Sequence, residues 1–256
     1  DSPLRKIAET VKRSGEKAAS MVQDLLTLAR RGVRVSSVVD LNRVVEDYFS
    51  SPEFERLRQF HPLVHFDVIL EDGLAALVGS EVHIGKTLMN LVSNAAEAMP
   101  EGGTVVVRTF SRRLDEPFSG YETIDAGEYV VLTVEGTGTG ISAEDQKKIF
   151  EPFFTKKVMG RSGTGLGMTV VWSTVKDHRG YIDIESEAGK GTRIDIYFPV
   201  TNRSIEDAGT AGSIADCAGT ERILVVDDEE DQLTLCRSIL EKLGYLLATA
   251  GFMAAL

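Results

Sequence analysis

The sequence predicts an α+β protein built as a two-layer α/β sandwich, in which a helix layer covers a mixed, largely antiparallel sheet. Two observations support this fold class. Apolar helical segments occur around residues 41–49 and 81–99, and five strand-like runs are grouped around them with little βαβ alternation. The last two runs are joined by the turn AGKG, which is typical of a hairpin. We expect a coiled-coil-like helix before this domain and the start of a βαβ unit after it.

The N-terminal segment, residues 1–33, carries an apolar stripe with alternating spacings of three and four, between Ser2-Pro3 and Gly32. The stripe consists of Leu4, Ile7, Val11, Ser14, Ala18, Met21, Leu25 and Leu28. Such a stripe fits a helical hairpin or a dimeric bundle, and it also fits one amphipathic helix packed on its own domain. We expect a homodimer that forms through residues 4–28.

The remaining chain divides by composition into three parts. Residues 36–200 contain the mixed pattern, with strands expected at VHFDVIL, TVVVRTF, EYVVLTVE, YIDIESE and TRIDIYF. Residues 201–220 are small, polar and without period, which indicates a linker. Residues 221–256 read as a buried strand, an acidic turn, a helix and a second strand. This last part is below the roughly 40 residues that a domain needs to bury its own core.

Composition excludes several classes of function. The net charge of −11 opposes a nucleic-acid surface, because such a surface relies on clustered Lys and Arg. The longest apolar runs are far shorter than the roughly 20 residues of a membrane span, and no signal peptide is recognisable. We therefore expect a cytoplasmic segment without direct nucleic-acid or membrane contact, although the full-length protein can still be membrane-associated. Cys217 and Cys236 are expected to be reduced thiols.

A pair of amides marks the helical pattern around residues 81–99. Asn90 and Asn94 lie one turn apart in NLVSNAAEAM, so they share a helix face. Two neutral oxygens at this spacing suit Mg²⁺ beside a triphosphate, because they add no charge. Taken alone, they also fit a solvated polar face.

Three further stretches point to phosphate chemistry. VEGTGTGIS sets Gly136, Gly138 and Gly140 directly after a strand, and GRSGTGLGMTVV sets Gly163, Gly165 and Gly167 before a helix. Free backbone N–H groups of a glycine loop at a helix N-terminus form an anion seat. IFEPFFTKK places an aromatic group beside Lys156 and Lys157. Each stretch alone is a weak signal, because such glycines are common in turns and such aromatics are common in cores.

In this order and spacing, the four stretches resemble the N, first G, F and second G boxes of the sensor histidine kinases, within the GHKL group of ATP-binding folds. The resemblance covers residues 1 to about 200. It implies that ATP and Mg²⁺ bind between helices and sheet beneath a mobile lid of roughly residues 141–167. The residues implied in nucleotide binding are Asn90, Asn94, Gly136, Gly138, Gly140, Lys156, Gly163, Thr164, Gly165, Leu166, Gly167 and Thr192.

The resemblance also assigns roles in catalysis. It implies Mg²⁺ coordination by Asn94, with Asn90 beside the metal and phosphates and Lys156 as an added charge. Asn90 stands where the ATPase members of the group, such as gyrase, have a Glu that acts as general base. An amide has no usable basicity, so phosphate transfer to a positioned side chain is favoured over hydrolysis.

The phosphate acceptor is expected to lie outside this chain. Residues 1–33 resemble the second helix of the dimerisation and phosphotransfer hairpin, whereas the acceptor His of that family lies on the first helix. The four histidines, His61, His65, His83 and His178, have other sequence settings. Residues 221–256 resemble the start of a response-regulator receiver domain, with Asp227 and Asp228 as its Mg²⁺-binding acids. These acids also fit a helix N-terminus. A truncated hybrid kinase with a cognate receiver or response regulator as partner is the expectation.

One position departs from the family pattern. Gly136 stands where the family has an Asp whose carboxylate accepts a hydrogen bond from the adenine amino group. Strand alternation puts position 136 on the face of Val134, so Glu135 cannot replace it. Losing the carboxylate should cost roughly 1.5–3 kcal/mol, or about tenfold to a hundredfold in affinity. A sequence change by a single base or in cloning would also explain this Gly.

Three hypotheses follow: a histidine kinase catalytic domain, a pseudokinase that acts as a dimerising scaffold because of Gly136, and a GHKL ATPase. Asn90 and the receiver-like segment both count against the ATPase.

Overall fold

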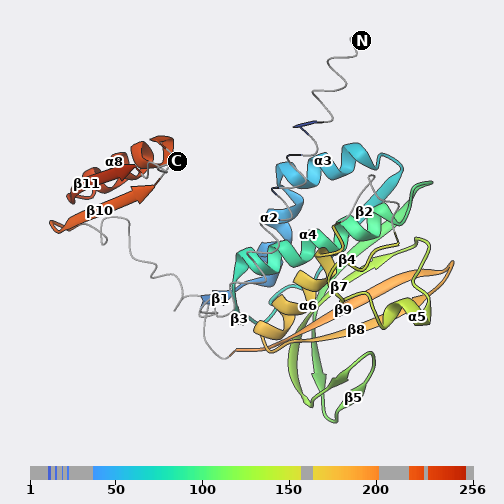
Figure 1. Ribbon diagram of the computed structural model, residues 1–256. Coiled ribbons are helices and arrows are strands. Elements are labelled where there is room, and N and C mark those ends of the chain that lie inside the picture. Colours follow the sequence, from blue (N-terminus) through green and yellow to red (C-terminus); the bar gives the residue numbers. More distant parts are fainter. Residues whose placement is uncertain are drawn as a thin grey trace. The chain divides into compact units, whose positions relative to one another are not determined.

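The computed structural model of the chain divides into two compact units, residues 1–205 and 206–256 (Figure 1). The structure describes residues 37–156, 164–201, 219–227 and 230–251, together with the single positions 11, 12, 15, 19 and 22, which are helical. Of the predicted N-terminal stripe, Val11 is described and 67% exposed, and the other seven positions lie outside the described residues.

The first unit has a helical part and a sheet part. The helices are α2 (Leu41–Phe49), α3 (Pro52–Phe60), α4 (Glu81–Glu97), α5 (Ala143–Gln146) and α6 (Gly167–Asp177). The main strands are β2 (Val64–Leu70), β4 (Gly103–Leu114), β7 (Gly127–Gly136), β8 (Tyr181–Glu187) and β9 (Gly191–Pro199). The described residues also form the short strands β1 (Ser37–Val39), β3 (Leu77–Gly79), β5 (Phe118–Ser119) and β6 (Thr123–Ile124).

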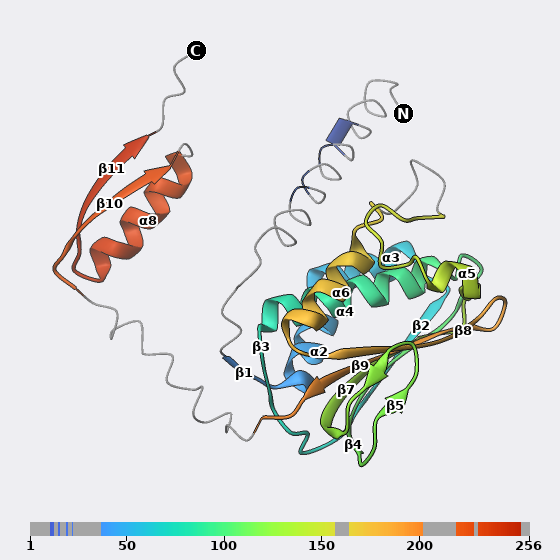
Figure 2. The same cartoon turned by 60° about the horizontal axis from the view of Figure 1, so that its bottom comes forward.

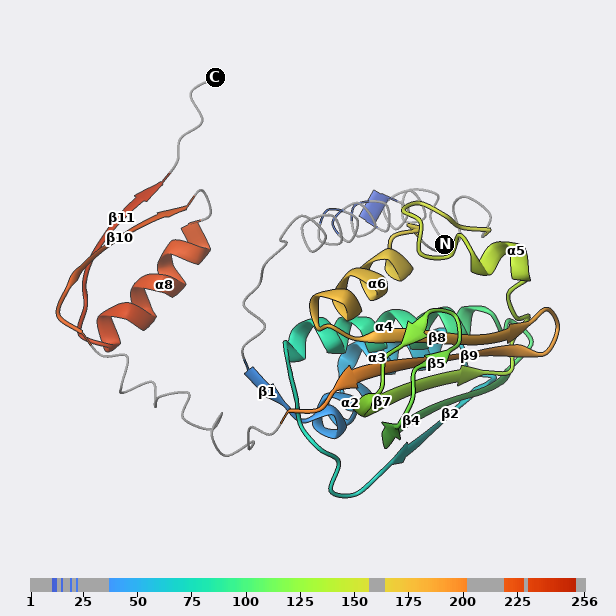
Figure 3. The same cartoon turned by 90° about the horizontal axis from the view of Figure 1, so that it is seen from below.

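The main sheet has five strands in the order β2-β4-β7-β9-β8. β2 pairs with β4 in parallel, and the other three pairings are antiparallel. Helices α2, α4 and α6 cover one face of this sheet (Figures 2 and 3). The prediction of a two-layer sandwich with a mixed, largely antiparallel sheet is therefore confirmed.

The main core lies between the helices and the sheet. α4 begins at Ser80, whose hydroxyl accepts a hydrogen bond from the backbone of His83, and it buries Ile84, Leu88 and Leu91 against the sheet. From β7, Val130, Leu132 and Val134 join this core, whereas Tyr129 and Val131 face a second cluster on the opposite side of the sheet. This alternation places Gly136 on the face toward the helices, as predicted.

The second cluster is covered by the β5–β6 hairpin, which the sequence analysis did not anticipate. The hairpin lies in the connection between β4 and β7, and its Phe118 and Ile124 pack against Tyr129 and Tyr197.

The second unit is described by itself. β10 (Arg222–Asp227) and β11 (Leu246–Gly251) pair in parallel and are connected through α8 (Glu230–Lys242). Leu233, Cys236, Leu240 and Leu243 are half-buried, in agreement with the predicted apolar helix face. This is the expected βαβ arrangement, but a βαβ unit alone does not identify a receiver domain.

Candidate nucleotide-binding site

The two predicted amides of α4 lie next to the N-terminus of α6. The Asn90 Nδ2 amide donates to the backbone oxygen of Gly167, the first residue of α6, at 3.3 Å. A Cβ added at Gly167 would lie 3.3 Å from Asn90 Oδ1, so the absence of a side chain allows this approach. Asn94 follows one turn later on the same helix. The structure therefore brings the N box and the second G box into direct contact.

The second glycine stretch ends in a loop that leaves the start of α6 without a side-chain cap. Leu166 occupies the N-cap position and is buried, and its own backbone N–H is satisfied by the Thr164 hydroxyl at 3.1 Å. Gly165 has φ +70° and approaches the backbone of Phe153 too closely for any side chain. The first N–H groups of α6 can therefore serve an anion. Gly163 lies outside the described residues.

Gly136 lies at the end of β7, between two other strands. Its register partners are Val105 on β4 and Thr192 on β9, so Thr192 stands directly beside the departure from the family pattern. A Cβ at position 136 would point toward α4 and would lie 3.2 Å from Ala95 Cβ. Glu135 points to the other face, where its carboxylate pairs with Arg108 at 2.6 Å. Glu135 therefore cannot supply the carboxylate that the resemblance predicts at position 136.

Gly138 and Gly140 are required by close backbone approach within the protein. A Cβ at Gly138 would lie 2.8 Å from the Ala98 backbone oxygen, at the end of α4. Gly140 has φ +68°, and a Cβ there would overlap the Glu187 backbone oxygen, at the end of β8. These two glycines therefore let the loop after β7 lie between α4 and the β8–β9 turn. The contacts belong to the chain itself, which the sequence analysis did not foresee.

Thr192 belongs to a hydroxyl network that holds the start of the lid region. Its Oγ1 lies 2.7 Å from Ser186 Oγ. The Ser186 hydroxyl donates to the Gly191 backbone oxygen at 2.9 Å and accepts from the Ile141 backbone N–H at 2.8 Å. Thr192 is therefore linked to the strand end that carries Gly136 and to the first residues of the predicted lid. This network was missed in the sequence, because Ser186 lies outside all four motifs.

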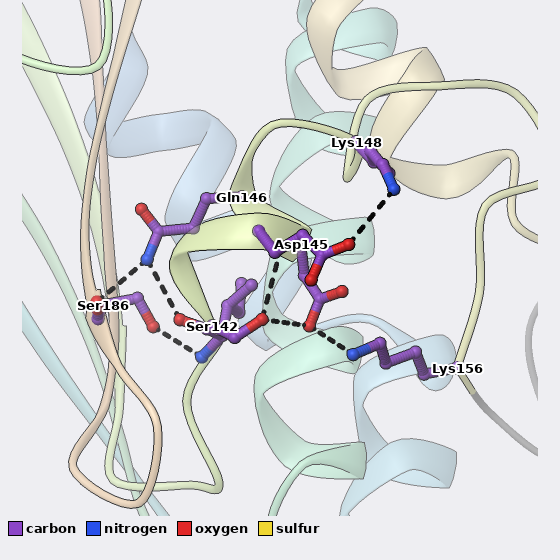
Figure 4. Close-up of polar contacts among 8 residues, drawn as sticks. Ser142, Asp145, Gln146, Lys148, Lys156 and Ser186 are labelled. Atoms are coloured by element: carbon purple, nitrogen blue, oxygen red, sulfur yellow. Dashed lines mark hydrogen bonds and ion pairs between the residues drawn. The ribbon is translucent and has the colours of Figure 1, made fainter.

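Lys156 is held by a carboxylate within the predicted lid (Figure 4). Its Nζ lies 2.5 Å from Asp145 Oδ2, and the same carboxylate accepts a hydrogen bond from the Ser142 hydroxyl. The hydrogen bonds from Lys156 and then from Ser142 lower the pKa of Asp145. Asp145 was not predicted, although Ser142 and Asp145 have the spacing of a helix capping box. Lys156 is exposed, so its side chain can also reach another anion.

The acidic pair of the second unit remains a prediction. Asp227 is the last residue of β10, and only its backbone is described. Asp228 lies outside the described residues. In the part of the chain that the structure describes, no group of three or more His, Cys, Asp and Glu residues could hold a metal ion.

His178 connects the far ends of the two helices that carry the amide and the phosphate loop. This buried imidazole lies just after α6, and its Nε2 accepts from the Ser80 backbone N–H, 2.9 Å away, at the start of α4. Its Nδ1 lies 2.7 Å from the Thr174 backbone oxygen, so Nδ1 carries the proton and the ring is neutral. Burial is the main cause that lowers the pKa of His178. Both ring nitrogens of His178 are therefore engaged by backbone groups of the fold.

Comparison with known proteins agrees with this geometry. Residues 79–202 match the family described as histidine kinase-, DNA gyrase B-, and HSP90-like ATPase. The sensor kinase CckA of Brucella abortus is 34% identical over 247 residues, which cover 86% of this chain and 24% of that protein. Sporulation kinase C of Bacillus subtilis is 32% identical over 126 residues, which cover 49% of this chain and 26% of that protein. The chain thus spans about a quarter of the length of these relatives.

The fold is also similar to that of a solved histidine kinase structure. The solved structure of the histidine kinase AdeS of Acinetobacter baumannii superposes with a TM-score of 0.59 at 20% identity, covering 79% of this chain and 88% of that one. Together, the sandwich fold, the contact between the motifs and these similarities show that the chain carries a catalytic domain of the sensor histidine kinase family. Within the described residues, no helix combines the length and apolar character that crossing a membrane requires.

Proposed function

We propose that residues 36–200 bind Mg-ATP and transfer its γ-phosphate to a histidine on a dimerisation helix, for relay to a receiver aspartate. The observation that carries this proposal is the direct contact between Asn90 on α4 and Gly167 at the uncapped start of α6. A triphosphate placed there would meet backbone N–H groups on one side and amide oxygens on the other.

The residues at this position suit a magnesium ion. The amide oxygen of Asn94, together with phosphate oxygens, would give the all-oxygen ligand set that Mg²⁺ prefers. Asn90 approaches Gly167 so closely that a Cβ there would lie 3.3 Å from Asn90 Oδ1, which places the amide beside the backbone groups that would meet the phosphates. When bound, Mg²⁺ would neutralise charge on the phosphates. We assign Asn94 to the metal, and Asn90 to holding the loop before α6 in place.

The remaining roles follow from the positions of the residues. Thr164, Gly165, Leu166 and Gly167 would meet the phosphates through backbone groups, as would Gly163 by resemblance. Lys156 would exchange Asp145 for a phosphate when nucleotide is present, because both partners are anionic. Thr192 and position 136 would line the base.

The same proposal extends to the parts around this domain. Residues 1–33 would form the second helix of a dimerisation hairpin, with the dimer formed through residues 4–28. Residues 201–220 would be a linker, and residues 221–256 the start of a receiver domain that uses Asp227 and Asp228 for Mg²⁺. A cognate receiver domain or response regulator would be the signalling partner.

A second candidate is a pseudokinase that acts as a dimerising scaffold. One observation favours it: position 136 has no side chain on the face toward α4, and the neighbouring carboxylate of Glu135 is engaged on the opposite face by Arg108. ATP binding would then be too weak for turnover. Variation at position 136 distinguishes the two candidates, as described in the Discussion.

Calorimetric titration with ATP, with and without Mg²⁺, tests the proposed site. Asn94→Ala should remove most of the Mg²⁺-dependent part of the affinity. Ser93→Ala is the matched control, because Ser93 lies on the same helix and bonds Glu97 through its hydroxyl at 3.5 Å. Equal effects of the two substitutions would contradict the assignment of Asn94. Incubation with γ-labelled ATP should leave the chain without stable label, and label on any of its four histidines would contradict the expected external acceptor.

A further inference from the structure

The β5–β6 hairpin ends in a tip, residues 120–122, that is anchored on the edge strand β8. The Tyr121 backbone N–H donates to Asp183 Oδ1 at 2.7 Å, and Asp183 is buried. Gly120 lies against the same carboxylate so closely that a Cβ would overlap it. The tip therefore packs closely against β8.

Glu122 fixes the other side of the tip. Its carboxylate accepts hydrogen bonds from Lys176 Nζ at 2.6 Å and from the backbone N–H of Ile182 at 2.5 Å. The Lys176 ammonium also lies 4.5 Å from the centre of the Trp172 ring. Both side chains of the ion pair are mostly buried, so the pair is less screened by solvent than a surface pair. β8 and α6 thus both hold the tip.

From this position, the Tyr121 side chain contacts the first part of the predicted lid, residues 141–150. Its hydroxyl donates to the Gln146 backbone oxygen at 3.1 Å, at the end of α5. Its ring packs edge-to-face on Phe150, with centroids 5.6 Å apart, and Phe150 packs on Trp172 at 4.9 Å. Tyr121 of the β5–β6 hairpin therefore contacts residues 141–150 through both its hydroxyl and its ring.

Within residues 141–150, the short helix α5 depends on such external contacts. α5 has four residues, none of them buried, so neither helix length nor core packing fixes it. Another attachment of α5 is Gln146, whose side chain donates to the backbone oxygens of Ile141 and Ser186 at 3.0 and 2.9 Å (Figure 4). After α5, Ile149 is buried in the main core. Gln146 thus ties α5 to β8, and Tyr121 ties it to the hairpin.

We propose that Tyr121 is a positioning residue that holds residues 141–150 and, through them, places Asp145 and Lys156 for nucleotide binding. The effect on nucleotide rests on the function proposed above. The effect on residues 141–150 does not, because it follows from contacts within the chain alone.

Hydrogen exchange of the backbone amides, measured without nucleotide, tests the structural part. Tyr121→Phe removes the hydroxyl and keeps the ring, so exchange in residues 141–150 should become about twofold to tenfold faster, as for the loss of one hydrogen bond. Tyr181→Phe is the matched control. The Tyr181 hydroxyl donates to Asp125 Oδ2 at 2.7 Å, which joins β8 to the same hairpin rather than to α5. Tyr121→Leu, which also removes the ring, should enlarge the local effect.

The outcomes separate the two proposals. Equal exchange of residues 141–150 in the Tyr121→Phe and Tyr181→Phe chains, or no change with Tyr121→Leu, would overturn the role of Tyr121. If the unaltered chain binds Mg-ATP, Tyr121→Phe should weaken that binding about twofold to fivefold, at a Tm matched by Tyr181→Phe. Unchanged affinity would overturn the positioning of Lys156. If the chain binds no ATP but Tyr121→Phe still speeds exchange in residues 141–150, the role of Tyr121 would be supported and only the proposed function would be contradicted.

Discussion

Restoring the carboxylate at position 136 is the change that most directly tests the nucleotide site. Gly136 is buried at the end of β7, and a new side chain there would point toward α4, on the same side of the sheet as Val134. Ala95 Cβ would lie 3.2 Å from the new Cβ, and Met99 Cε would lie 3.8 Å away. The Cβ of Gly136→Asp therefore needs a displacement of a few tenths of an ångström at Ala95.

The expected gain is the difference between a charged hydrogen bond and this steric cost. A carboxylate that accepts a hydrogen bond from the adenine amino group contributes about 1.5–3 kcal/mol. Ala95 is only half-buried, so the overpacking cost should stay near the low end of its usual range, at about 1 kcal/mol. The net gain of about 0.5–2 kcal/mol corresponds to roughly twofold to thirtyfold tighter ATP binding.

Parallel calorimetric titrations with ATP and GTP measure this gain and its specificity. Guanine has an acceptor oxygen where adenine has its amino donor, so Gly136→Asp should not strengthen GTP binding. Gly136→Asn is the matched control, because it has the same size without the charge and should gain less. Adding Ala95→Gly to Gly136→Asp should remove the steric cost and increase the ATP affinity further.

Three results would refute this reasoning. Tight and adenine-selective binding by the unaltered chain would show that position 136 does not read the base. Equal gains with Asp and Asn would show that charge is not the cause. Failure of the Gly136→Asp chain to bind ATP at all would count against the histidine kinase activity and leave the scaffold as the better account.

Three further predictions concern the surroundings of the site. Gly140→Ala should lower the free energy of unfolding by about 1–3 kcal/mol, because φ is +68° and the new Cβ meets backbone; unchanged denaturant unfolding would contradict this. Lys156→Met should weaken ATP binding about threefold to tenfold. Lys148→Met, which removes another exposed cation of the lid, should leave ATP binding unchanged. Equal titration curves for the two variants would rule out a contact between Lys156 and the phosphates. Folding lowers the pKa of His178, so the stability that the neutral imidazole contributes is present above its ordinary pKa of about 6.5 and is lost as the pH falls. The Tm should therefore drop when the pH is lowered from 7.5 to about 5.5. His178→Gln keeps an acceptor for the Ser80 N–H and should make the Tm depend less on pH.

The sequence predicted the long elements of the catalytic domain well. The helices near residues 41–49 and 81–99 and all five main strands are present, since each carries a strong period of 3.6 or 2. It also predicted that Thr192 and position 136 turn toward the helices, because strand parity is local information. Elements without such a period were missed. α3 has one buried side chain, Phe54, and β5 and β6 have two residues each, so their positions depend on contacts from distant parts of the chain.

The role of the glycines was predicted only in part. The run at positions 136–140 indicated that something must approach the backbone closely, and this is correct for Gly138 and Gly140. What approaches is the end of α4 and the end of β8, which are distant in sequence. The partner of Lys156 was likewise not predicted, because an exposed lysine can pair with any nearby carboxylate.

The sequence by itself determined the family of the domain and the order of its motifs, and it predicts a missing carboxylate at position 136, because each of these depends on residue type and spacing along the chain. The tertiary structure decided which atoms meet: Asn90 with Gly167, Ala95 with position 136, and Tyr121 with Gln146. These pairs are 77, 41 and 25 residues apart by their numbers, so only the packing of helices on the sheet brings them together. Features that depend on residue type and local spacing could be predicted from the sequence, whereas contacts between residues far apart in the chain could not.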